Sequence, residues 1–314
     1  MGRDGGPDPL ELCADGRTVA VTHPGRVLHP EAGFTKGAAA EHLAAVAPLM
    51  LPRVRGRPAS FRRYPAGVGG EVFSAKNAPR GTPARVRAVR LPSPDSTRGR
   101  AEVEYVVADD AATRLWAANP AALEVHVPQW RVGPRGGVHR PDLVVLDLDP
   151  GAPADVVACC RVAELLREVL AADGLRAWPK RSGSKGLQLY VTVAEAAAGR
   201  TEAYARAVAE LLERRHPGLA VSRTDRSLRG GRVFVDWARN NAARTTVAPY
   251  SLRARALPTV STPLAWDEVE ACREAEELRF TAPDVLERAE RRGDPVAEVP
   301  GTRQRLPRAP AAAS

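Results

Sequence analysis

The sequence predicts an α/β protein in the broad sense, and within that class an α+β fold of mostly antiparallel strands mixed with helices. Short apolar and β-branched runs bounded by Gly or Pro indicate strands, for example at 143–146 and 232–237. The clearest helix covers 153–172, where apolar residues recur at helical spacing and Gly174 follows. The 314 residues, 44% of them hydrophobic, suffice for one large domain or two moderate ones.

The remaining elements follow from the same patterns, read in chain order. Residues 1–16 are polar and rich in Gly and Pro, so we expect a flexible arm there, one domain over 17–299 and a disordered tail over 300–314. Further strands are expected over residues 17–21, 58–64, 101–107 and 187–193. Further helices are expected over residues 38–51, with Thr35 as N-cap and Pro52 at the end, and over 111–124, 201–215, 266–273 and 284–292.

Composition limits the classes of function. The 46 Lys and Arg against 37 Asp and Glu give a net charge of +9 and a pI near 9.9. A basic protein most often binds nucleic acid or another polyanion. The alternative is that the positive charge only keeps the protein soluble and reflects an Arg-rich proteome. The 4 cysteines form no CxxC pair, which indicates reduced thiols and neither a zinc site nor disulfides. No stretch resembles a signal peptide or a membrane span, so we expect a soluble cytoplasmic protein.

Two aspartates end the strand at 143–146. Asp147 and Asp149 flank Leu148. Because side chains alternate along a strand, both carboxylates project from one face while the leucine points to the core. Two close carboxylates repel one another, and a hard cation such as Mg²⁺ or Mn²⁺ removes that repulsion. The pair indicates a metal-dependent phosphoryl or nucleotidyl transfer centre, and a solvated acidic turn is the alternative.

A third aspartate lies in another apolar strand. Asp236 follows Val233, Phe234 and Val235, in a segment that has little use for a charge. A carboxylate from a neighbouring strand would complete a two-metal site. The alternative is an ion pair with a flanking arginine, Arg232 or Arg239, and the sequence does not decide between the two.

Residues 182–186, Ser-Gly-Ser-Lys-Gly, form a candidate phosphate-binding turn. Such a turn exposes backbone N–H groups and adds the charge of Lys185. It is not a Walker A loop, because the GxxxxGK[ST] spacing is missing and a strand follows, and an ordinary hairpin turn is the alternative. Arg253 and Arg255 would face one side of an extended segment and could hold a triphosphate.

Three further polar residues lie on expected strands. Arg62 and Arg63 would face opposite sides, so only one of them is expected to face a ligand. His126 could contact a sugar, although a lone histidine is more often structural.

Taken together, these stretches resemble the polymerase domain of bacterial ligase D, an end-joining branch of the archaeo-eukaryotic primase superfamily. The resemblance covers nearly the whole expected domain, from about residue 19 to about residue 297. It rests on the order of Thr22 to Arg26, Thr35-Lys-Gly37, Gly56-Arg-Pro58, Arg62 to Pro65, Lys76 to Pro79, Ala122 to His126, Asp142 to Gly151, Ser182 to Leu187, Gly231 to Trp237, Pro249 to Arg253 and Ser261 to Trp266. It implies a primase-like catalytic core of mostly antiparallel sheets flanked by helices.

The resemblance also implies an activity. Members extend DNA ends and fill gaps in double-strand break repair as nucleotidyltransferases that prefer ribonucleotides and use two Mn²⁺ or Mg²⁺ ions. The implied substrates are DNA ends or gaps with a 5′-phosphate, and NTPs or dNTPs. The implied partners are Ku and a separate ATP-dependent DNA ligase, with no membrane and a cytoplasmic, nucleoid-associated location. No ligase motif or nuclease segment is recognised, so a stand-alone polymerase subunit is expected.

Residue roles carry over by position. By the resemblance, three aspartates are catalytic and hold the metals: Asp147, Asp149 and Asp236. The residues implied to contact the nucleotide are Arg62, His126, Ser182, Gly183, Lys185, Gln188 and Arg253. Those implied to contact DNA are Arg26 and Lys36 at the downstream 5′-phosphate, Phe73 on the template, and Arg229 on a loop before the third aspartate.

Four positions depart from the family pattern. Gln188 stands where the phosphate motif normally has a histidine, and an amide can donate a hydrogen bond but carries no charge. Arg62 and Arg26 stand where lysine is usual, which keeps the charge and changes the geometry. Val72 replaces the first residue of an aromatic pair, so template stacking rests on Phe73.

Two other functions remain open from the residues. A haloacid-dehalogenase-like phosphatase also has a strand that ends in Asp-x-Asp, although here the motif lies mid-chain and Pro150 follows it. A non-catalytic DNA-end binding module would explain Gln188 as a mark of a degenerate site. Retention of all three aspartates argues against that module, because buried carboxylates without a metal are unfavourable.

Overall fold

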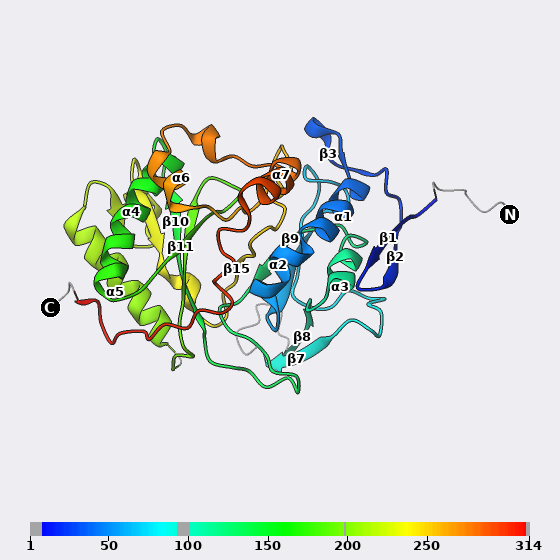
Figure 1. Ribbon diagram of the computed structural model, residues 1–314, viewed down its shortest axis with the longest axis horizontal. Helices are drawn as coiled ribbons and strands as arrows, with labels where there is room; N and C mark the ends of the chain where they lie inside the picture. The colour runs from blue at the N-terminus through cyan, green and yellow to red at the C-terminus, as the bar shows by residue number, and fades with distance from the viewer. Residues whose placement is uncertain (1–7, 93–100, 198, 312–314) are drawn as a thin grey trace.

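The computed structural model describes residues 8–92, 101–197 and 199–311. Two lobes lie side by side, each built on one sheet, and the first and last described residues lie at opposite sides of the molecule (Figure 1). The first lobe comes mainly from the N-terminal half and the second from the C-terminal half. No helix in these described ranges is both long and apolar enough to cross a membrane.

The first lobe contains a six-stranded sheet in which every pairing is antiparallel. Its strands are, in spatial order, β15 (Thr246–Val247), β9 (Ala122–Val127), β5 (Pro58–Arg63), β8 (Glu102–Val107) and β7 (Ala88–Pro92), with β6 (Phe73–Ala75) also on β5. The helices of this lobe are α1 (Lys36–Ala45), α2 (Ala47–Val54) and α3 (Ala111–Trp116). Leu43, Met50, Leu115 and Leu123 belong to one buried cluster that joins helices and sheet.

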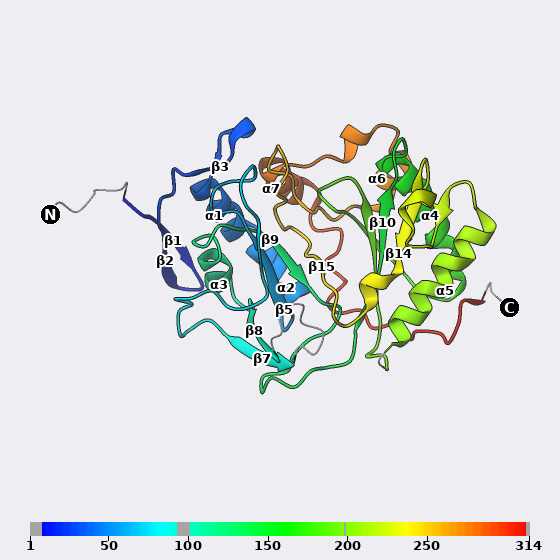
Figure 2. The same ribbon diagram turned by 180° about the vertical axis from the view of Figure 1, so that it is seen from behind.

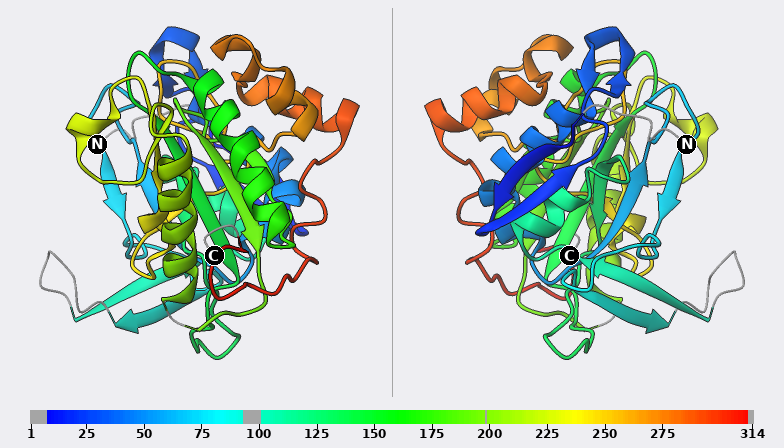
Figure 3. Two further views of the ribbon diagram at one scale, coloured as in Figure 1. Left: turned by 90° about the vertical axis from the view of Figure 1, so that its left-hand side faces the viewer. Right: turned by 90° about the vertical axis from the view of Figure 1, so that its right-hand side faces the viewer.

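The second lobe contains a five-stranded sheet with α-helices on its outer face. Its strands are, in order, β11 (Trp178–Arg181), β12 (Leu187–Thr192), β10 (Leu143–Pro150), β14 (Val233–Asp236) and β13 (Ala220–Val221). Only the β13–β14 pair is parallel. Two long helices, α4 (Val156–Ala172) and α5 (Arg200–Arg215), run across the outer face, as the left view of Figure 3 shows.

Alternation along β10 decides where the acidic residues point. Val144, Leu146 and Leu148 are fully buried in the core shared with α4 and α5. The residues between them therefore project from the opposite face of the sheet, toward the other lobe. The expected inward orientation of Leu148 is confirmed.

Shorter elements complete the structure. They are β1 (Leu10–Ala14), β2 (Arg17–Val21), β3 (Val27–His29), η1 (Pro30–Ala32), β4 (Phe34–Thr35), η2 (Arg226–Arg229), η3 (Trp237–Asn240), α6 (Trp266–Ala271), η4 (Ala275–Leu278) and α7 (Ala282–Arg292). Helix α7 comes late in the chain, yet its Ala282 and Val285 pack into the core of the first lobe. It lies between the two lobes in Figures 1 and 2.

The predicted mixture of antiparallel sheets and helices is confirmed, but two predicted helices are wrong. The helix expected over 38–51 is two helices, α1 and α2, that meet at Val46, and Pro52 lies inside α2. Thr35 does cap α1, because its hydroxyl accepts from Ala38 N at 3.2 Å. The helix expected over 111–124 ends at Trp116, and β9 begins at Ala122 because this segment pairs with β5.

Both ends of the chain are more ordered than expected. The predicted flexible arm over 1–16 includes β1, which forms a hairpin with β2 and packs Leu10 and Leu12 against the first core. In the predicted tail, Leu306 is buried and Gln304 donates a hydrogen bond to Thr192 O at 3.0 Å. Apolar and backbone-pairing residues in both segments explain the difference. Residues 1–7 and 312–314 lie outside the described part.

Candidate active site

Strand register places four polar side chains in one row across the inner face of the second sheet. Asp147 on β10 is opposite Asp236 on β14 and opposite Gln188 on β12, and Gln188 is opposite Lys180 on β11. Residues directly opposite each other in a ladder share a face. The sheet therefore brings two of the three predicted metal ligands together, with the family-divergent Gln188 beside them.

The Asp147 carboxylate is buried and engaged on both oxygens. Gln188 Nε2 donates to its Oδ1 at 3.0 Å, and Arg239 Nε lies 3.2 Å from its Oδ2. Burial, reinforced by the nearby charge of Asp149, raises the pKa of Asp147 to about 6. The surrounding side chains therefore only partly balance the negative charge of Asp147.

Arg239 also contacts the second carboxylate. Its Nε lies 2.9 Å from Asp236 Oδ2, and burial raises the pKa of Asp236 in spite of this ion pair. Pairing with a flanking arginine was one of the two sequence interpretations, and Arg239 makes that pair, whereas Arg232 donates to Pro217 O at 3.2 Å. The ion-pair interpretation is confirmed for Arg239, and the role of Asp236 as a metal ligand stays a prediction.

The donor set matches a hard divalent cation, but the side chains are not yet arranged around one. Within the described ranges, no group of three or more acidic, histidine or cysteine side chains stands ready to enclose an ion. Asp147, Asp149 and Asp236 nevertheless offer only carboxylate oxygens, the ligands that Mg²⁺ and Mn²⁺ prefer. Arg239 lies against two of these carboxylates and supplies positive charge to them.

The predicted phosphate turn lies directly on the aspartate strand. Ser182 N donates to Gly186 O at 3.1 Å, which closes the turn. A Cβ on Gly186 would lie 2.1 Å from Leu148 O, so only glycine fits between the turn and β10. Lys185 Nζ donates to Pro150 O at 3.1 Å, one residue beyond Asp149. The turn and the carboxylates therefore form one site.

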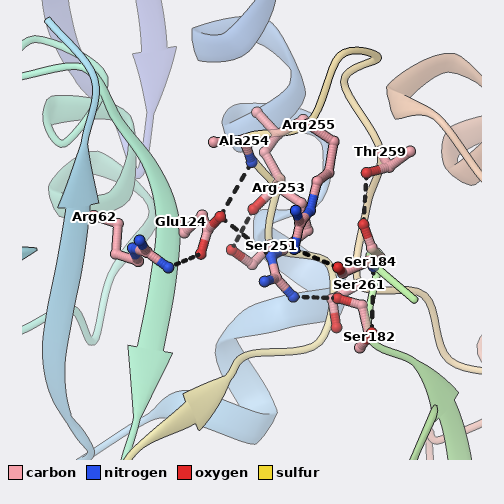
Figure 4. Close-up of polar contacts among 12 residues, drawn as sticks. Arg62, Glu124, Ser182, Ser184, Ser251, Arg253, Ala254, Arg255, Thr259 and Ser261 are labelled. Atoms are coloured by element: carbon pink, nitrogen blue, oxygen red, sulfur yellow. Dashed lines mark hydrogen bonds and ion pairs between the residues drawn. The ribbon is translucent and has the colours of Figure 1, made fainter. Parts of the chain in front are cut away.

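Two arginines brace this turn from the 253–260 segment. Arg253 Nη1 donates to Ser182 O at 2.5 Å, and Arg255 Nη2 contacts Ser184 Oγ (Figure 4). The condition that this segment is extended is not met, because Arg255 N donates to Arg253 O at 3.0 Å and the backbone turns there. Both cations still reach the turn. Gly183 has a φ of +69°, and a Cβ there would lie 2.7 Å from Arg253 Cγ.

A buried carboxylate that sequence reasoning missed collects the other nucleotide-binding candidates. Glu124 Oε2 accepts from His126 Nε2 at 2.8 Å and lies 3.8 Å from Arg62 Nη1. Glu124 Oε1 lies 3.3 Å from Arg253 Nε and accepts from Ala254 N at 3.1 Å. Figure 4 shows Arg62 and Arg253 approaching Glu124 from two sides. A charge inside the apolar strand at 122–127 was the signal that could have identified it.

Two of the predicted DNA contacts lie together in the first lobe. Lys36 N donates to Arg26 O at 2.8 Å, and Lys36 Nζ donates to Thr22 O at 2.7 Å. Burial, together with the charge of Arg26, lowers the pKa of Lys36. The two positive charges therefore influence each other, and their role at a DNA 5′-phosphate stays a prediction.

The other two predicted DNA contacts lie apart from this pair. Phe73 is 41% exposed on β6, which leaves its ring open to a partner. The Arg229 guanidinium lies 3.7 Å from the centroid of the Phe234 ring, and Phe234 is opposite Asp149 in the sheet. Arg229 is therefore placed beside the carboxylates.

Comparison with known proteins agrees with this geometry. The model of the LigD primase-polymerase domain matches residues 35–296. The multifunctional non-homologous end joining protein LigD of Mycolicibacterium smegmatis is 39% identical over 282 residues, which are 89% of this chain and 36% of that protein. The bifunctional LigD of Bacillus subtilis is 30% identical over 257 residues, which are 81% of this chain and 40% of that protein. The chain thus spans well under half the length of these relatives.

A solved structure is similar as well. The polymerase domain of Mycobacterium tuberculosis ligase D, in complex with DNA, superimposes with a TM-score of 0.83 at 36% identity, over 91% of this chain and 99% of that one. Fold and site define a nucleotidyltransferase of the primase-polymerase class. The chain belongs to the LigD primase-polymerase domain family. The resemblance identified from the sequence is confirmed, and the phosphatase alternative is ruled out.

Proposed function

We propose that this chain adds nucleotides to the 3′-hydroxyl of DNA ends and gaps during double-strand break repair. The observation that carries the proposal is the register of the second sheet, which sets Asp147 beside Asp236 under the phosphate turn. A primer hydroxyl and the α-phosphate of a nucleotide would meet at these carboxylates. Membership of the primase-polymerase family supports this reaction over other phosphoryl transfers.

We infer that Asp147, Asp149 and Asp236 would hold two Mn²⁺ or Mg²⁺ ions. Bound ions of this kind lower the pKa of an attacking hydroxyl and stabilise the charge on the transferred phosphoryl group. Burial of Asp147, which leaves its charge incompletely compensated, supports this role. In the absence of ions, Arg239 would hold the carboxylates of Asp147 and Asp236 in place. Its guanidinium would turn away when the ions bind.

We infer that the incoming nucleotide lies between the phosphate turn and Glu124. Backbone N–H groups and cations around the turn would bind the triphosphate, and His126 would contact the sugar. The residues proposed for this role are Arg62, His126, Ser182, Gly183, Lys185, Gln188 and Arg253. Within this set, Gln188 donates to Asp147 Oδ1 in the structure, so it would also hold that carboxylate in place.

We infer that DNA lies along the first lobe and reaches the second lobe at Arg229. Arg26 and Lys36 would bind the 5′-phosphate of a downstream strand, Phe73 would stack on the template, and Arg229 would contact DNA beside the carboxylates. The net charge of +9 supports binding to a polyanion, and such binding should weaken steeply with salt. We also propose Ku and an ATP-dependent DNA ligase as partners, and a nucleoid-associated location.

Extension of a gapped DNA primer tests the proposal. The substrate carries a downstream 5′-phosphate, and each rNTP and dNTP is supplied with Mn²⁺. We expect templated addition by the wild type and none by the Asp147→Ala/Asp149→Ala protein. DNA binding without any addition by the wild type would support a non-catalytic end-binding module instead, the alternative that Gln188 favours, and Gln188→His would then be the next protein to measure.

A further inference from the structure

Glu124 connects three residues that come from distant parts of the chain. Its side chain is 3% exposed, and its carboxylate is reached by Arg62 from β5, by His126 on its own strand and by Arg253 from the segment after β15. Two separate elements of the nucleotide site, one for the sugar and one for the triphosphate, thus share a single anion. Removal of the Glu124 carboxylate would free both His126 and Arg253 from their shared partner.

The charge state of Glu124 fixes the hydrogen on His126. Burial alone would raise the pKa of Glu124, but the hydrogen bond from His126 and the charge of Arg253 lower it well below its usual range. An ionised carboxylate only accepts, so His126 Nε2 must carry the hydrogen that it shares with Glu124 at 2.8 Å. Burial lowers the pKa of His126, only partly offset by Glu124, which keeps the ring neutral near pH 7.

A neutral imidazole with its hydrogen on Nε2 presents a bare Nδ1. No described residue hydrogen-bonds to His126 Nδ1, and this nitrogen is not among the buried polar atoms that lack a partner. The side chain retains 17% exposure. Nδ1 is therefore an accessible acceptor that cannot donate.

We propose that Glu124 is a positioning residue that holds His126 as an obligate hydrogen-bond acceptor for the 2′-hydroxyl of the incoming nucleotide, while it keeps Arg253 beside the phosphate turn. This inference rests on the proposed nucleotide site. On this proposal, the Nε2–H tautomer of His126 is what distinguishes ribonucleotides from deoxyribonucleotides. An acceptor rewards a 2′-substituent that donates a hydrogen bond, and it gains nothing from one that only accepts.

Nucleotides with three different sugars distinguish the effect of hydrogen-bond donation by the 2′-substituent from the effect of its size. A 2′-hydroxyl can donate, a 2′-fluorine is of similar size and can only accept weakly, and a 2′-hydrogen does neither. For the wild type we expect the ribonucleotide to exceed both others by about tenfold in kcat/KM, as one good hydrogen bond allows, with the fluoro and deoxy nucleotides nearly equal.

Glu124→Gln reverses the tautomer with little change in shape. The amide oxygen is needed where Ala254 N and Arg253 require an acceptor, so the amide NH₂ turns to His126 Nε2. The hydrogen then moves to Nδ1, which becomes a donor. We expect the ribo-over-deoxy preference to fall severalfold, and the fluoro nucleotide to gain over the deoxy one.

Glu268→Gln is the matched control. Glu268 is another largely buried carboxylate paired with an arginine, Arg288, but it lies in the C-terminal helices away from the nucleotide site. We expect its sugar preferences to equal those of the wild type. An equal loss for all three sugars in Glu124→Gln, with their ratios unchanged, would show that Glu124 is merely structural and would overturn the proposal.

Nitrogen-15 NMR of the imidazole rings gives a readout that does not depend on polymerase activity. The chain has 6 histidines, and His126→Gln assigns the signal of His126. We expect the Nε2–H tautomer in the wild type and the Nδ1–H tautomer in Glu124→Gln. An Nδ1–H signal in the wild type would overturn the inference even if the enzyme polymerises. Failure of the wild type to extend any primer would instead overturn the proposed function, and the NMR result would still decide what Glu124 does to His126.

Discussion

Arg239 Nε lies 2.9 Å from Oδ2 of Asp236 and joins it to the neighbouring aspartate of the same sheet row. The guanidinium supplies, in the metal-free protein, the positive charge that two buried carboxylates need. If these carboxylates hold a divalent cation, as we propose, this ion pair and the cation would compete for the same oxygens. The competition makes the electrostatics of the site measurable without substrate.

Replacement of Arg239 by a neutral residue should lower the stability of the protein without metal and raise its affinity for Mn²⁺. We expect Arg239→Gln to lower the free energy of unfolding without metal by about 1–3 kcal/mol, because a buried charge loses its partner. Mn²⁺ should bind about tenfold more tightly, because its competitor is gone. Denaturant unfolding and Mn²⁺ titration measure the two effects. Arg232→Gln, at a half-buried arginine off the row, should change neither, and weaker Mn²⁺ binding in Arg239→Gln would contradict the competition.

The raised pKa of Asp147 predicts how the stability of the metal-free protein depends on pH. The folded state binds this proton up to about pH 6, whereas an unfolded aspartate releases it near pH 4, so the free energy of unfolding falls as pH rises between these values. The decrease should be on the order of 2–3 kcal/mol. Unfolding in urea with a chelator, from pH 4 to 7, measures it. The contribution of Asp147 is the free energy of unfolding of the wild type minus that of Asp147→Asn, because other carboxyls with lowered pKa, such as Glu124, act in the opposite sense. A difference that rises with pH across this range would contradict the prediction.

The hydrogen bond from Gln188 to Asp147 favours the ionised carboxylate. Gln188→Leu removes the donor, so the pKa of Asp147 should rise further. We expect kcat/KM at pH 7 to fall by about tenfold and the rising limb of the pH–rate profile to move to higher pH. Leu187→Ile, a neighbour that faces the opposite side of β12, is the control. An unchanged profile in Gln188→Leu would show that the amide does not act through Asp147.

Close packing of the phosphate turn should make Gly183 intolerant of any side chain. Its φ of +69° and the 2.7 Å approach of Arg253 Cγ both oppose a Cβ. We expect Gly183→Ala to lower the free energy of unfolding by about 2–4 kcal/mol and to weaken nucleotide binding. Thermal unfolding and nucleotide titration measure this. Gly218→Ala, where a Cβ meets nothing within 4 Å, should be neutral; equal effects of the two substitutions would contradict the packing argument.

The Arg26 and Lys36 pair should read the end of a downstream strand. We expect Lys36→Ala to reduce the gain in activity from a downstream 5′-phosphate by about tenfold and to leave extension of a substrate without a downstream strand unchanged. Gap filling with phosphorylated and unphosphorylated downstream strands measures the ratio. Arg90→Ala, at an exposed arginine on β7, is the matched control. An equal loss on both substrates would show that Lys36 serves the fold rather than the phosphate.

Local patterns were enough to predict part of the site. Alternation along one strand placed Asp147 and Asp149 on one face and Leu148 in the core, and the structure confirms it. The glycines of the phosphate turn followed from local sequence too. Strand pairing did not: the segment at 111–124 has helical composition, but its second half is drawn into the sheet by pairing with β5.

The contacts that sequence reasoning missed join residues far apart in the chain. Arg239 reaches Asp147 across 92 positions, and Ala254 N reaches Glu124 across 130. The spacing of apolar residues along the sequence predicts helices and strands, but it does not predict contacts between residues so far apart in the chain. The sequence left Asp236 undecided between a metal and an arginine, because both depend on which strand lies next to β10.

The arrangement of Asp147, Asp149, Asp236 and Arg239 with metal bound tests the central claim most directly. A crystal structure with Mn²⁺ and a non-hydrolysable nucleotide would locate the ions by their anomalous scattering. We expect Mn²⁺ on the three carboxylates, with Arg239 turned away from Asp147 and Asp236. Ions located elsewhere, with Arg239 still bridging the two aspartates, would contradict the proposed site.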